Sequence, residues 1–177
     1  EVGRQMDNPT VSQMVYPIMQ MADIAMLGVD AALGGIDQRK IHMLAREYLP
    51  SKNYPSPVCI HVPILHGLDG KKMSSSQGNY ISVAESEEDI RKKMKKAFCP
   101  PEIEDNPVLQ VLQHHIFPRL DTVTIERPEK FGGNRAFGSY EEMEQAYAKG
   151  EIHPADLKTA VAESLVTILA PVREYLR

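Results

Sequence analysis

Cysteine is scarce in this sequence, long apolar runs are absent, and no segment repeats. The only two cysteines, Cys59 and Cys99, lie far apart and without the close spacing of a metal site. We therefore expect two reduced thiols, as in a cytoplasmic protein, and no protein-bound metal. No stretch reaches the about 18 consecutive apolar residues that span a membrane, which predicts a chain without a membrane partner. The lack of repeats excludes a solenoid.

An excess of positive charge is also absent, because the formal net charge is −4 over 177 residues. A composition of 42% hydrophobic and 25% charged residues is that of an ordinary globular protein with a core. A surface that is basic throughout is excluded, so any nucleic-acid contact has to be a local patch. One basic run fits either an RNA backbone contact or a solvated helix face that complements the helix dipole: Arg91, Lys92, Lys93, Lys95 and Lys96.

The most distinctive stretch is rich in lysine, serine and glycine. Lysine supplies charge, hydroxyls and backbone N–H groups supply donors, and glycine lets the backbone approach, so this composition suits a polyphosphate. The spacing of the common P-loop is missing. The alternative is a solvated surface loop without a ligand. The stretch reads Lys71-Lys72-Met73-Ser74-Ser75-Ser76-Gln77-Gly78-Asn79 and follows Asp69-Gly70.

The first part of the chain alternates helix and strand patterns. This order is typical of βα units, in which ligands bind at the carboxyl ends of parallel strands. The expected elements are a helix over 9–28 with Pro17 in its first turn, a strand over 29–33, a tight turn at Gly34-Gly35, a helix over 37–48 and a strand over 58–62.

The pattern becomes mostly helical after residue 83. We therefore place the domain boundary there, with part of an α/β domain over 1–83 and a helical domain over 84–177. Helices are expected to start at Ser86, Asn106, Ser139 and His153, with a short strand over 122–126, and Pro171 is expected to bend or end the last helix.

Three polar side chains of the first expected helix fall on one face, because Tyr16, Gln20 and Asp23 are spaced i, i+4 and i+7. Gln38 follows the Gly34-Gly35 turn. Carboxylate and carboxamide groups that converge there suit the ammonium and hydroxyl groups of an amino acid. The alternative is a set of solvated or locally satisfied polar positions.

Five strings follow one another along the chain: Tyr16-Pro17-Ile18-Met19-Gln20-x-x-Asp23, Gly34-Gly35-Ile36-Asp37-Gln38-Arg39-Lys40-Ile41-His42, Gly67-Leu68-Asp69-Gly70 with Lys72-Met73-Ser74-Ser75-Ser76, Arg127-Pro128-Glu129-Lys130-Phe131-Gly132-Gly133, and His153-Pro154-Ala155-Asp156-Leu157-Lys158. In this order they resemble the tyrosyl-tRNA synthetases of the archaeal and eukaryotic type. The lysine–serine string is similar to the KMSKS signature of class I aminoacyl-tRNA synthetases. The resemblance covers nearly the whole chain.

The resemblance implies a ligase that joins L-tyrosine to tRNA(Tyr) in two steps, through a tyrosyl-adenylate made from ATP. It implies that Tyr16, Gln20 and Gln38 hold the amino and carboxyl ends of tyrosine and that Asp23 accepts the phenolic O–H. The catalytic residues would be Lys72, Ser74, Ser75 and Ser76, and the same four residues together with Met73 would bind ATP.

The resemblance also assigns RNA contacts and an assembly. Arg39 and Lys40 would contact the acceptor stem, Phe131 would stack on an anticodon base, and His153 and Asp156 would bind beside it. The implied fold is α/β: the back half of a Rossmann-type parallel sheet with the KMSKS-like loop, followed by an α-helical anticodon-binding domain. Mg²⁺ would arrive with ATP, and the full-length protein would be a cytoplasmic homodimer.

Two departures from the family pattern carry consequences. Ser75 stands where the second lysine of KMSKS is expected, and Lys71 is the residue that could replace its charge. The HIGH-type motif is not found, which implies that this chain is the C-terminal half of a synthetase and does not form adenylate by itself. Two other functions stay open: a tryptophanyl-tRNA synthetase, and a non-catalytic RNA-binding protein that descends from a synthetase.

Overall fold

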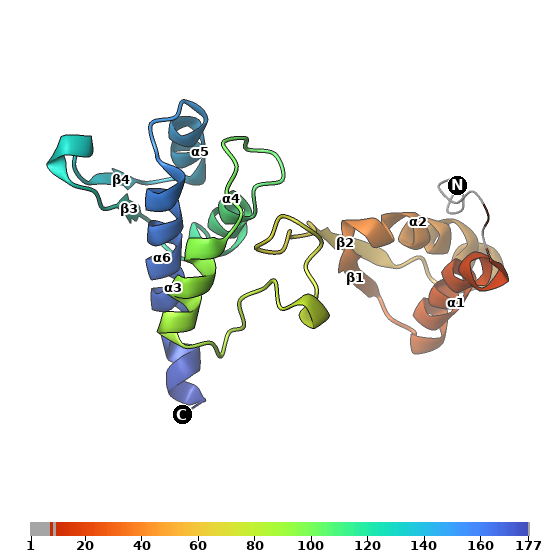
Figure 1. Cartoon of the computed structure of the whole chain (residues 1–177). Coiled ribbons are helices and arrows are strands. Elements are labelled where there is room, and N and C mark those ends of the chain that lie inside the picture. Colours follow the sequence, from red (N-terminus) through yellow and green to blue (C-terminus); the bar gives the residue numbers. More distant parts are fainter. Residues whose placement is uncertain (1–7, 9, 177) are drawn as a thin grey trace. The chain divides into compact units, whose positions relative to one another are not determined.

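The computed structural model describes residues 8 and 10–176 of the chain. The chain divides into two compact units, unit 1 over Glu1–Ile64 and unit 2 over Leu65–Arg177. Figure 1 colours unit 1 from red to yellow and unit 2 from yellow to blue. Each unit is described by itself.

Unit 1 begins with helix α1 (Val11–Leu27), which starts at a capping box. The Thr10 hydroxyl accepts from the Gln13 N–H, and the Gln13 side chain accepts from the Thr10 N–H at 2.9 Å, so two of the free donors at the helix start are satisfied. Because this cap starts the helix at Val11, Pro17 lies inside α1, where it is buried. The prediction that Pro17 lies in the first turn is therefore wrong. The helix ends at Gly28, whose φ is 60°.

The strands of unit 1 form a parallel pair, as the βα pattern predicts. β1 (Ala31–Gly35) pairs with β2 (Val58–Val62), and α2 (Arg39–Tyr48) connects them after a short 3-10 turn. The expected strand over 29–33 lies two residues later, because Gly34 and Gly35 pair with His61 and Val62 instead of forming a tight turn. A mixed α/β fold is thus confirmed for this part of the chain.

One face of this sheet is apolar and exposed among the described residues of unit 1. Val58, Ile60 and Val62 of β2 are exposed, and Leu33 of β1 is 70% exposed. Parallel sheets are ordinarily covered on both faces. The packing of unit 1 therefore concentrates on the opposite face, between the strands and α2.

The described residues of unit 2 form four α-helices and a small antiparallel sheet. The helices are α3 (Glu87–Lys96), α4 (Pro107–Val111), which continues as a π-helical turn over Leu112–Ile116, α5 (Tyr140–Ala148) and α6 (Pro154–Tyr175). β3 (Val123–Ile125) pairs with β4 (Arg135–Phe137), a strand that the sequence did not predict. The predicted helix starts at Ser86, Asn106, Ser139 and His153 are all confirmed, and the side chain of each accepts a backbone N–H of the first turn.

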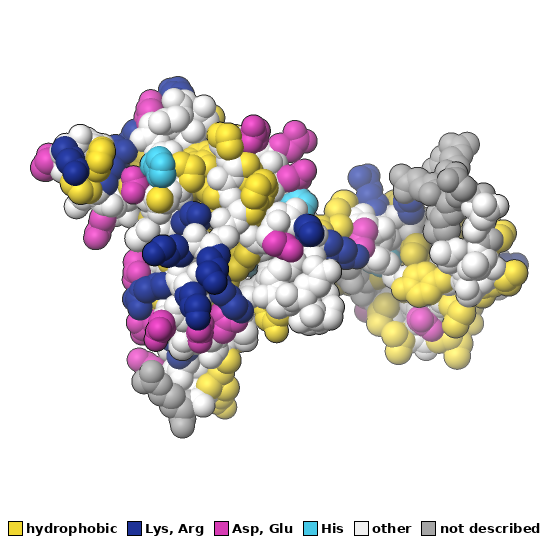
Figure 2. Space-filling model, viewed as in Figure 1, with side chains coloured by type: hydrophobic (Ala, Val, Ile, Leu, Met, Phe, Trp, Pro, Cys, Tyr) yellow, Lys and Arg dark blue, Asp and Glu magenta, His cyan; other side chains and the backbone are white. Residues whose placement is uncertain are grey.

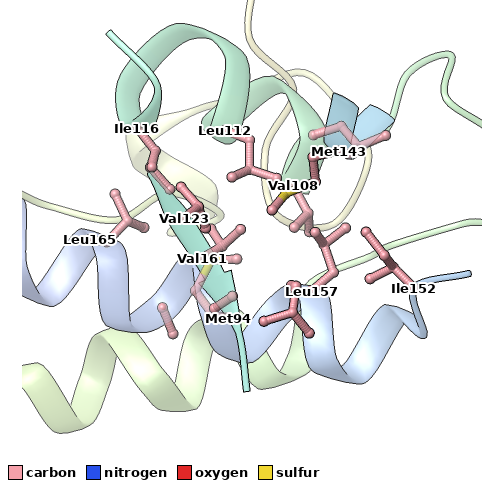
Figure 3. Packing of buried hydrophobic residues seen from close by; sticks show 14 of the residues in the cluster. Met94, Val108, Leu112, Ile116, Val123, Met143, Ile152, Leu157, Val161 and Leu165 are labelled. Atoms are coloured by element: carbon pink, nitrogen blue, oxygen red, sulfur yellow. The ribbon is translucent and has the colours of Figure 1, made fainter. Parts of the chain in front are cut away.

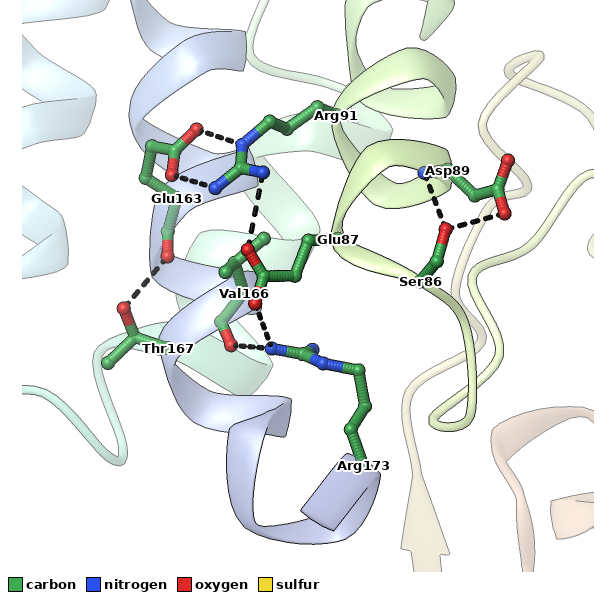
Figure 4. A network of polar contacts seen from close by, with 8 residues as sticks. All are labelled: Ser86, Glu87, Asp89, Arg91, Glu163, Val166, Thr167 and Arg173. Carbon is green, nitrogen blue, oxygen red and sulfur yellow. Dashed lines mark hydrogen bonds and ion pairs between the residues drawn. The ribbon is translucent and has the colours of Figure 1, made fainter. Parts of the chain in front are cut away.

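The core of unit 2 is continuous and fully buried at its centre. Figure 3 shows side chains of α3, α4, the π-helical turn, β3, α5 and α6 that point toward one another. α3 lies against α6, and the two helices are also joined by charged side chains (Figure 4). Arg91 of α3 contacts Glu163 at 2.7 Å, and Arg173 of α6 donates to the Val166 carbonyl at 2.7 Å and lies 3.5 Å from Glu87.

The last helix passes through Pro171 and ends at Tyr175, so Pro171 does not end the helix, and that part of the prediction is wrong. A proline inside a helix removes one backbone donor. Arg173 stabilises the part of α6 that contains Pro171, because it donates to the Val166 carbonyl and pairs with Glu87 of α3.

Residues 65–83 belong to unit 2, whereas the sequence placed the boundary near residue 84. The backbone N–H of Phe98, just after α3, donates to the Leu68 carbonyl at 2.7 Å. The His66 N–H donates to the Gln110 side chain at 2.8 Å. Because these bonds join the segment to the helical unit, the compact division falls at Ile64 and Leu65.

Candidate functional site

Three side chains predicted to bind an amino acid lie on one face of α1. Tyr16 is 58% exposed, Asp23 is exposed, and Gln20 between them is half-buried. The Gln20 Oε1 atom is buried and has no hydrogen-bond partner among the described residues. A buried amide oxygen without a partner costs free energy, so this position favours a ligand donor more than a local structural role.

The fourth predicted residue follows the carboxyl end of β1. The 3-10 turn Ile36–Gln38 begins directly after the strand, and the Gln38 Nε2 donates to Asp37 Oδ2 at 3.1 Å. A Cβ at Gly34 would lie 3.2 Å from the Gln38 Cβ, and a Cβ at Gly35 would lie 2.5 Å from Asp37 Oδ1. The two glycines therefore let the turn start close against the strand end.

The structure groups these four residues in unit 1, where α1 packs against α2, but it forms no hydrogen bond between Gln38 and the α1 face within the described residues. Arg39 and Lys40 are exposed and open α2 directly after Gln38. Two cations at a helix N-terminus lie next to the positive end of the helix dipole. Such an arrangement attracts an anion, which agrees with the predicted RNA contact without testing it.

Beneath Gly34 lies a pair of histidines in contact, which the sequence did not predict. His42 on α2 is 3% exposed, and its Nδ1 lies 3.1 Å from the His61 Nε2 on β2. Burial, and then the nearby charge of His61, lower the pKa of His42 from its ordinary value. A Cβ at Gly34 would lie 3.1 Å from the His42 ring. No spacing in the sequence signals this contact, because in β2 His61 lies on the face opposite to the apolar Val58, Ile60 and Val62.

The lysine–serine loop is organised by one buried side chain, Asn79, which is 9% exposed. Its Oδ1 accepts from the Ser74 N–H at 2.9 Å, and its Nδ2 donates to Asp69 Oδ1 at 2.8 Å and to the Lys72 carbonyl at 3.2 Å. These bonds fix the backbone of the loop while the side chains of Lys71 and Lys72 stay exposed. Asn79 is part of the stretch rich in lysine, serine and glycine, but its sequence position did not predict this role.

The serine side chains of this loop contact one another in part. The Ser74 and Ser76 hydroxyls lie 2.8 Å apart, and residues Ser75–Gln77 form a 3-10 turn that ends at Gly78 with φ 63°. Hydroxyls and lysines gathered on one exposed turn present the donors that phosphate oxygens require.

The Asp69-Gly70 turn anchors the other end of the loop. Hydrogen bonds from the Asn79 side chain and the Lys71 N–H lower the pKa of the Asp69 carboxyl. Gly70 has φ 76°, and a Cβ there would lie 2.6 Å from the Phe98 ring. Glycine is required at this position by both the backbone conformation and the close approach.

A third cluster unites Phe131, His153 and Asp156, which are distant in sequence. All three line one cavity of unit 2, of about 540 Å³. Phe131 is 63% exposed and therefore does not fill the local core. The Lys130 Nζ lies 4.9 Å from the ring centroid of Phe131.

Polar bonds shape the wall of this cavity. The Arg127 Nε donates to the Gly133 carbonyl and its Nη1 to the Glu151 carbonyl, both at 2.9 Å, which joins the Phe131 loop to the turn before α6. The His153 Nδ1 accepts from the Ala155 N–H at 3.1 Å, so in the neutral ring the proton resides on Nε2. The cavity thus combines an exposed aromatic face, a ring donor and a carboxylate.

No group of three or more His, Cys, Asp or Glu side chains within residues 8 and 10–176 is arranged to hold a metal ion. Among the helices described, none is both long and apolar enough to cross a bilayer.

Comparison with known proteins shows the family of the chain. Residues 1–170 match the family of tRNA synthetases class I (W and Y). The chain is 97% identical over 177 residues to a tyrosine–tRNA ligase of Methanospirillum hungatei JF-1 and 60% identical to one of Methanosarcina barkeri, and it covers 56% of each. It therefore spans about half the length of the curated relatives that it matches.

Solved structures show the same likeness. A tyrosyl-tRNA synthetase of Archaeoglobus fulgidus, complexed with L-tyrosine, is 54% identical with a TM-score of 0.83, over 98% of this chain and 55% of that one. A tryptophanyl-tRNA synthetase of Aeropyrum pernix K1 has a TM-score of 0.69 at 20% identity, over 99% of this chain and 50% of that one, which is a likeness of fold alone.

Proposed function

Because the chain belongs to the class I tRNA synthetases (W and Y), we propose that it is part of an enzyme that ligates L-tyrosine to tRNA(Tyr). The observation that carries this proposal is the Gln20 Oε1 atom, which has no hydrogen-bond partner among the described residues and belongs to a side chain between Tyr16 and Asp23 on one face of α1. The identity of 97% to a tyrosine–tRNA ligase supports tyrosine over tryptophan as the amino acid.

Tyrosine selection rests on Asp23 in this proposal. The carboxylate accepts the phenolic O–H, while Tyr16, Gln20 and Gln38 bind the amino and carboxyl ends. Phenylalanine lacks the hydroxyl and would leave Asp23 desolvated without a donor, and an unmade bond to a charged group is costly. The site therefore discriminates through a polar group that only tyrosine satisfies.

The first chemical step is attack of a tyrosine carboxylate oxygen on the α-phosphorus of ATP. A new oxygen–phosphorus bond forms, the bond to the β-phosphate breaks, and pyrophosphate leaves with the negative charge. Lys72 and the hydroxyls of Ser74, Ser75 and Ser76 stabilise that charge, and the Met73 backbone holds the nucleotide. Lys71 supplies the charge of the second KMSKS lysine.

Closure of the loop on ATP is part of the proposal. Gly70 and Gly78 both have positive φ and stand at the two ends of the lysine–serine turn. Mg²⁺ accompanies ATP and takes phosphate oxygens and water as ligands, which is its usual mode of binding to a nucleotide.

The second step transfers the tyrosyl group to the 3′ end of tRNA. A terminal ribose hydroxyl attacks the carbonyl carbon of the adenylate, and AMP leaves. In this step Arg39 and Lys40 bind the acceptor stem, and the cavity of Phe131, His153 and Asp156 binds an anticodon base by stacking and by hydrogen bonds to its edge. The full-length protein is proposed to be a homodimer in the cytoplasm.

The test uses a completed chain, in which this segment replaces the corresponding part of the Methanospirillum hungatei relative. We expect ATP–pyrophosphate exchange with tyrosine and none with phenylalanine or tryptophan, whereas the 177-residue chain alone gives no exchange. Asp23→Ala lowers kcat/KM for tyrosine by roughly ten- to a hundredfold, as expected for a lost bond to a charged group.

The matched control is Asp30→Ala, an exposed carboxylate of the same unit whose side chain has no hydrogen bond within the described residues. It leaves exchange unchanged. If the completed chain exchanges with no amino acid but binds RNA, the assignment as a ligase fails and an RNA-binding function replaces it. Exchange with tryptophan alone would transfer the proposal to the tryptophanyl enzymes.

A further inference from the structure

Positively charged side chains gather in and beside a groove between α3 and α6. Its volume is about 440 Å³, and Lys95 and Lys158 line it. Lys92 and Lys96 are exposed and share the adjoining face of α3 at i, i+4. Figure 2 shows dark blue side chains gathered over α3 in a chain whose net charge is −4.

Two ordinary roles of such lysines are already filled by other groups. A lysine near a helix C-terminus can bind the free carbonyls, but at the end of α3 Lys158 does so, donating to the Lys95 carbonyl at 2.9 Å and the Ala97 carbonyl at 3.3 Å. The side chains of Lys95 and Lys96 are therefore not needed as caps.

The nearby carboxylates are occupied as well. Glu163 accepts two bonds from Arg91, at 2.7 and 2.9 Å, and this hydrogen bonding lowers its pKa (Figure 4). Glu87 contacts Arg91 and Arg173. Within the described residues no carboxylate lies within 4.0 Å of Lys92, Lys95 or Lys96. The three ammonium groups are thus available to an external anion.

The groove and the Phe131 cavity flank the same turn of α6. Pro154 and Asp156 line the cavity, whereas Ala155 and Lys158 line the groove. A helix with its side chains is about 10–12 Å wide, so the two hollows lie within the reach of a few nucleotides. An RNA strand with a base in the cavity would pass its backbone over the groove.

We propose that the α3–α6 groove binds the phosphate backbone of the RNA strand whose base occupies the Phe131 cavity, with Lys92, Lys95 and Lys96 as the phosphate contacts. This inference rests on the proposed function for the identity of the RNA. Phosphate contacts position a strand without reading its sequence, so the groove supplies affinity and the cavity supplies selectivity.

The test is a salt titration of RNA binding by the 177-residue chain. The probes are two synthetic hairpins, one with the anticodon loop of tRNA(Tyr) and one with a scrambled loop. Each phosphate contact adds about 0.7–0.9 to the slope of log K against log salt. The variant Lys92→Gln/Lys95→Gln therefore lowers that slope by roughly 1.4–1.8 and weakens both hairpins equally, roughly tenfold at low salt.

Two variants control for charge and for fold. Lys92→Arg/Lys95→Arg keeps the charges and retains the wild-type slope. Arg46→Gln/Lys52→Gln removes two exposed cations from unit 1 and also retains it. A wild-type slope in the Lys92→Gln/Lys95→Gln variant would overturn the proposal.

Failure of the proposed function gives a different result. Phe131→Ala is expected to abolish the preference for the anticodon loop and to leave the salt slope unchanged. If both hairpins bind the wild-type chain equally and Phe131→Ala changes nothing, the cavity does not read the anticodon, while the slope still decides whether the groove binds phosphate.

Discussion

The two units of this chain differ in where their apolar side chains lie. Unit 2 encloses a continuous core over α3–α6 and β3, with Met94, Leu112 and Leu157 fully buried. Among its described residues, unit 1 buries small side chains beside α2, such as Ile41 and Ala45, and exposes the apolar face of its sheet. Stability in this chain is thus concentrated in the unit that holds the loop and the cavity, whereas the candidate tyrosine residues stand on the less packed unit.

The largest expected effect comes from emptying the core of unit 2. Met94 is 0% exposed, so Met94→Ala is expected to lower the free energy of unfolding of unit 2 by about 2–5 kcal/mol, because it leaves a cavity. Met26 of α1 is 80% exposed, and Met26→Ala is expected to change stability by less than about 0.5 kcal/mol. Urea unfolding followed by amide hydrogen exchange resolves the two units. Equal losses at both positions would contradict the difference in packing.

A second comparison sets a satisfied amide against an unsatisfied one. Asn79 makes three hydrogen bonds in unit 2, so Asn79→Ala is expected to destabilise the loop by about 1–3 kcal/mol. Gln20 of unit 1 has an oxygen without a partner in the described residues, so Gln20→Ala should cost almost no stability. In the completed chain, however, it should raise KM for tyrosine.

The measurements for this pair are thermal unfolding and pyrophosphate exchange on the same preparations. A loss of stability in Gln20→Ala without a change of KM would show that its amide is structural. Gln77→Ala serves as the control for the loop, because Gln77 is exposed and its side chain makes no hydrogen bond to a described residue.

Local signals in the sequence predicted the starts of most helices, since a cap such as Ser86 or Asn106 needs only residues two or three positions away. They did not predict the register of β1, because the pairing of Gly34 with His61 is made by residues distant in sequence. β4 was missed for the same reason. The boundary near residue 84 followed composition, whereas the bonds that join Leu68 to Phe98 and His66 to Gln110 follow from tertiary packing.

The candidate sites divide in a similar way. Helix periodicity placed Tyr16, Gln20 and Asp23 on one face. The resemblance to synthetases, and not periodicity, singled out Phe131, His153 and Asp156, which the structure brings to one cavity. The central role of Asn79 and the contact of His42 with His61 depend on three-dimensional geometry that no spacing rule predicts.

The smallest expected effect is on how the stability of each unit depends on pH. It involves one histidine in each unit, His42 in unit 1 and His115 in unit 2. Burial comes first among the causes that lower the pKa of His42 in unit 1 and of His115 in unit 2 from 6.5, followed by the charge of His61 for the first and of Arg119 for the second. An unfolded histidine therefore takes up its proton at a higher pH than either folded one. The contribution of each histidine to stability is fully present above about pH 6.5 and falls as the pH drops below that value.

His42→Gln should weaken this pH dependence in unit 1 alone, and His115→Gln should weaken it in unit 2 alone. The measurement is amide exchange between pH 5 and 8, roughly the range in which histidine titrates. If His42→Gln altered the pH dependence of both units equally, their stabilities would be coupled, and the contrast in packing would no longer describe two independent units.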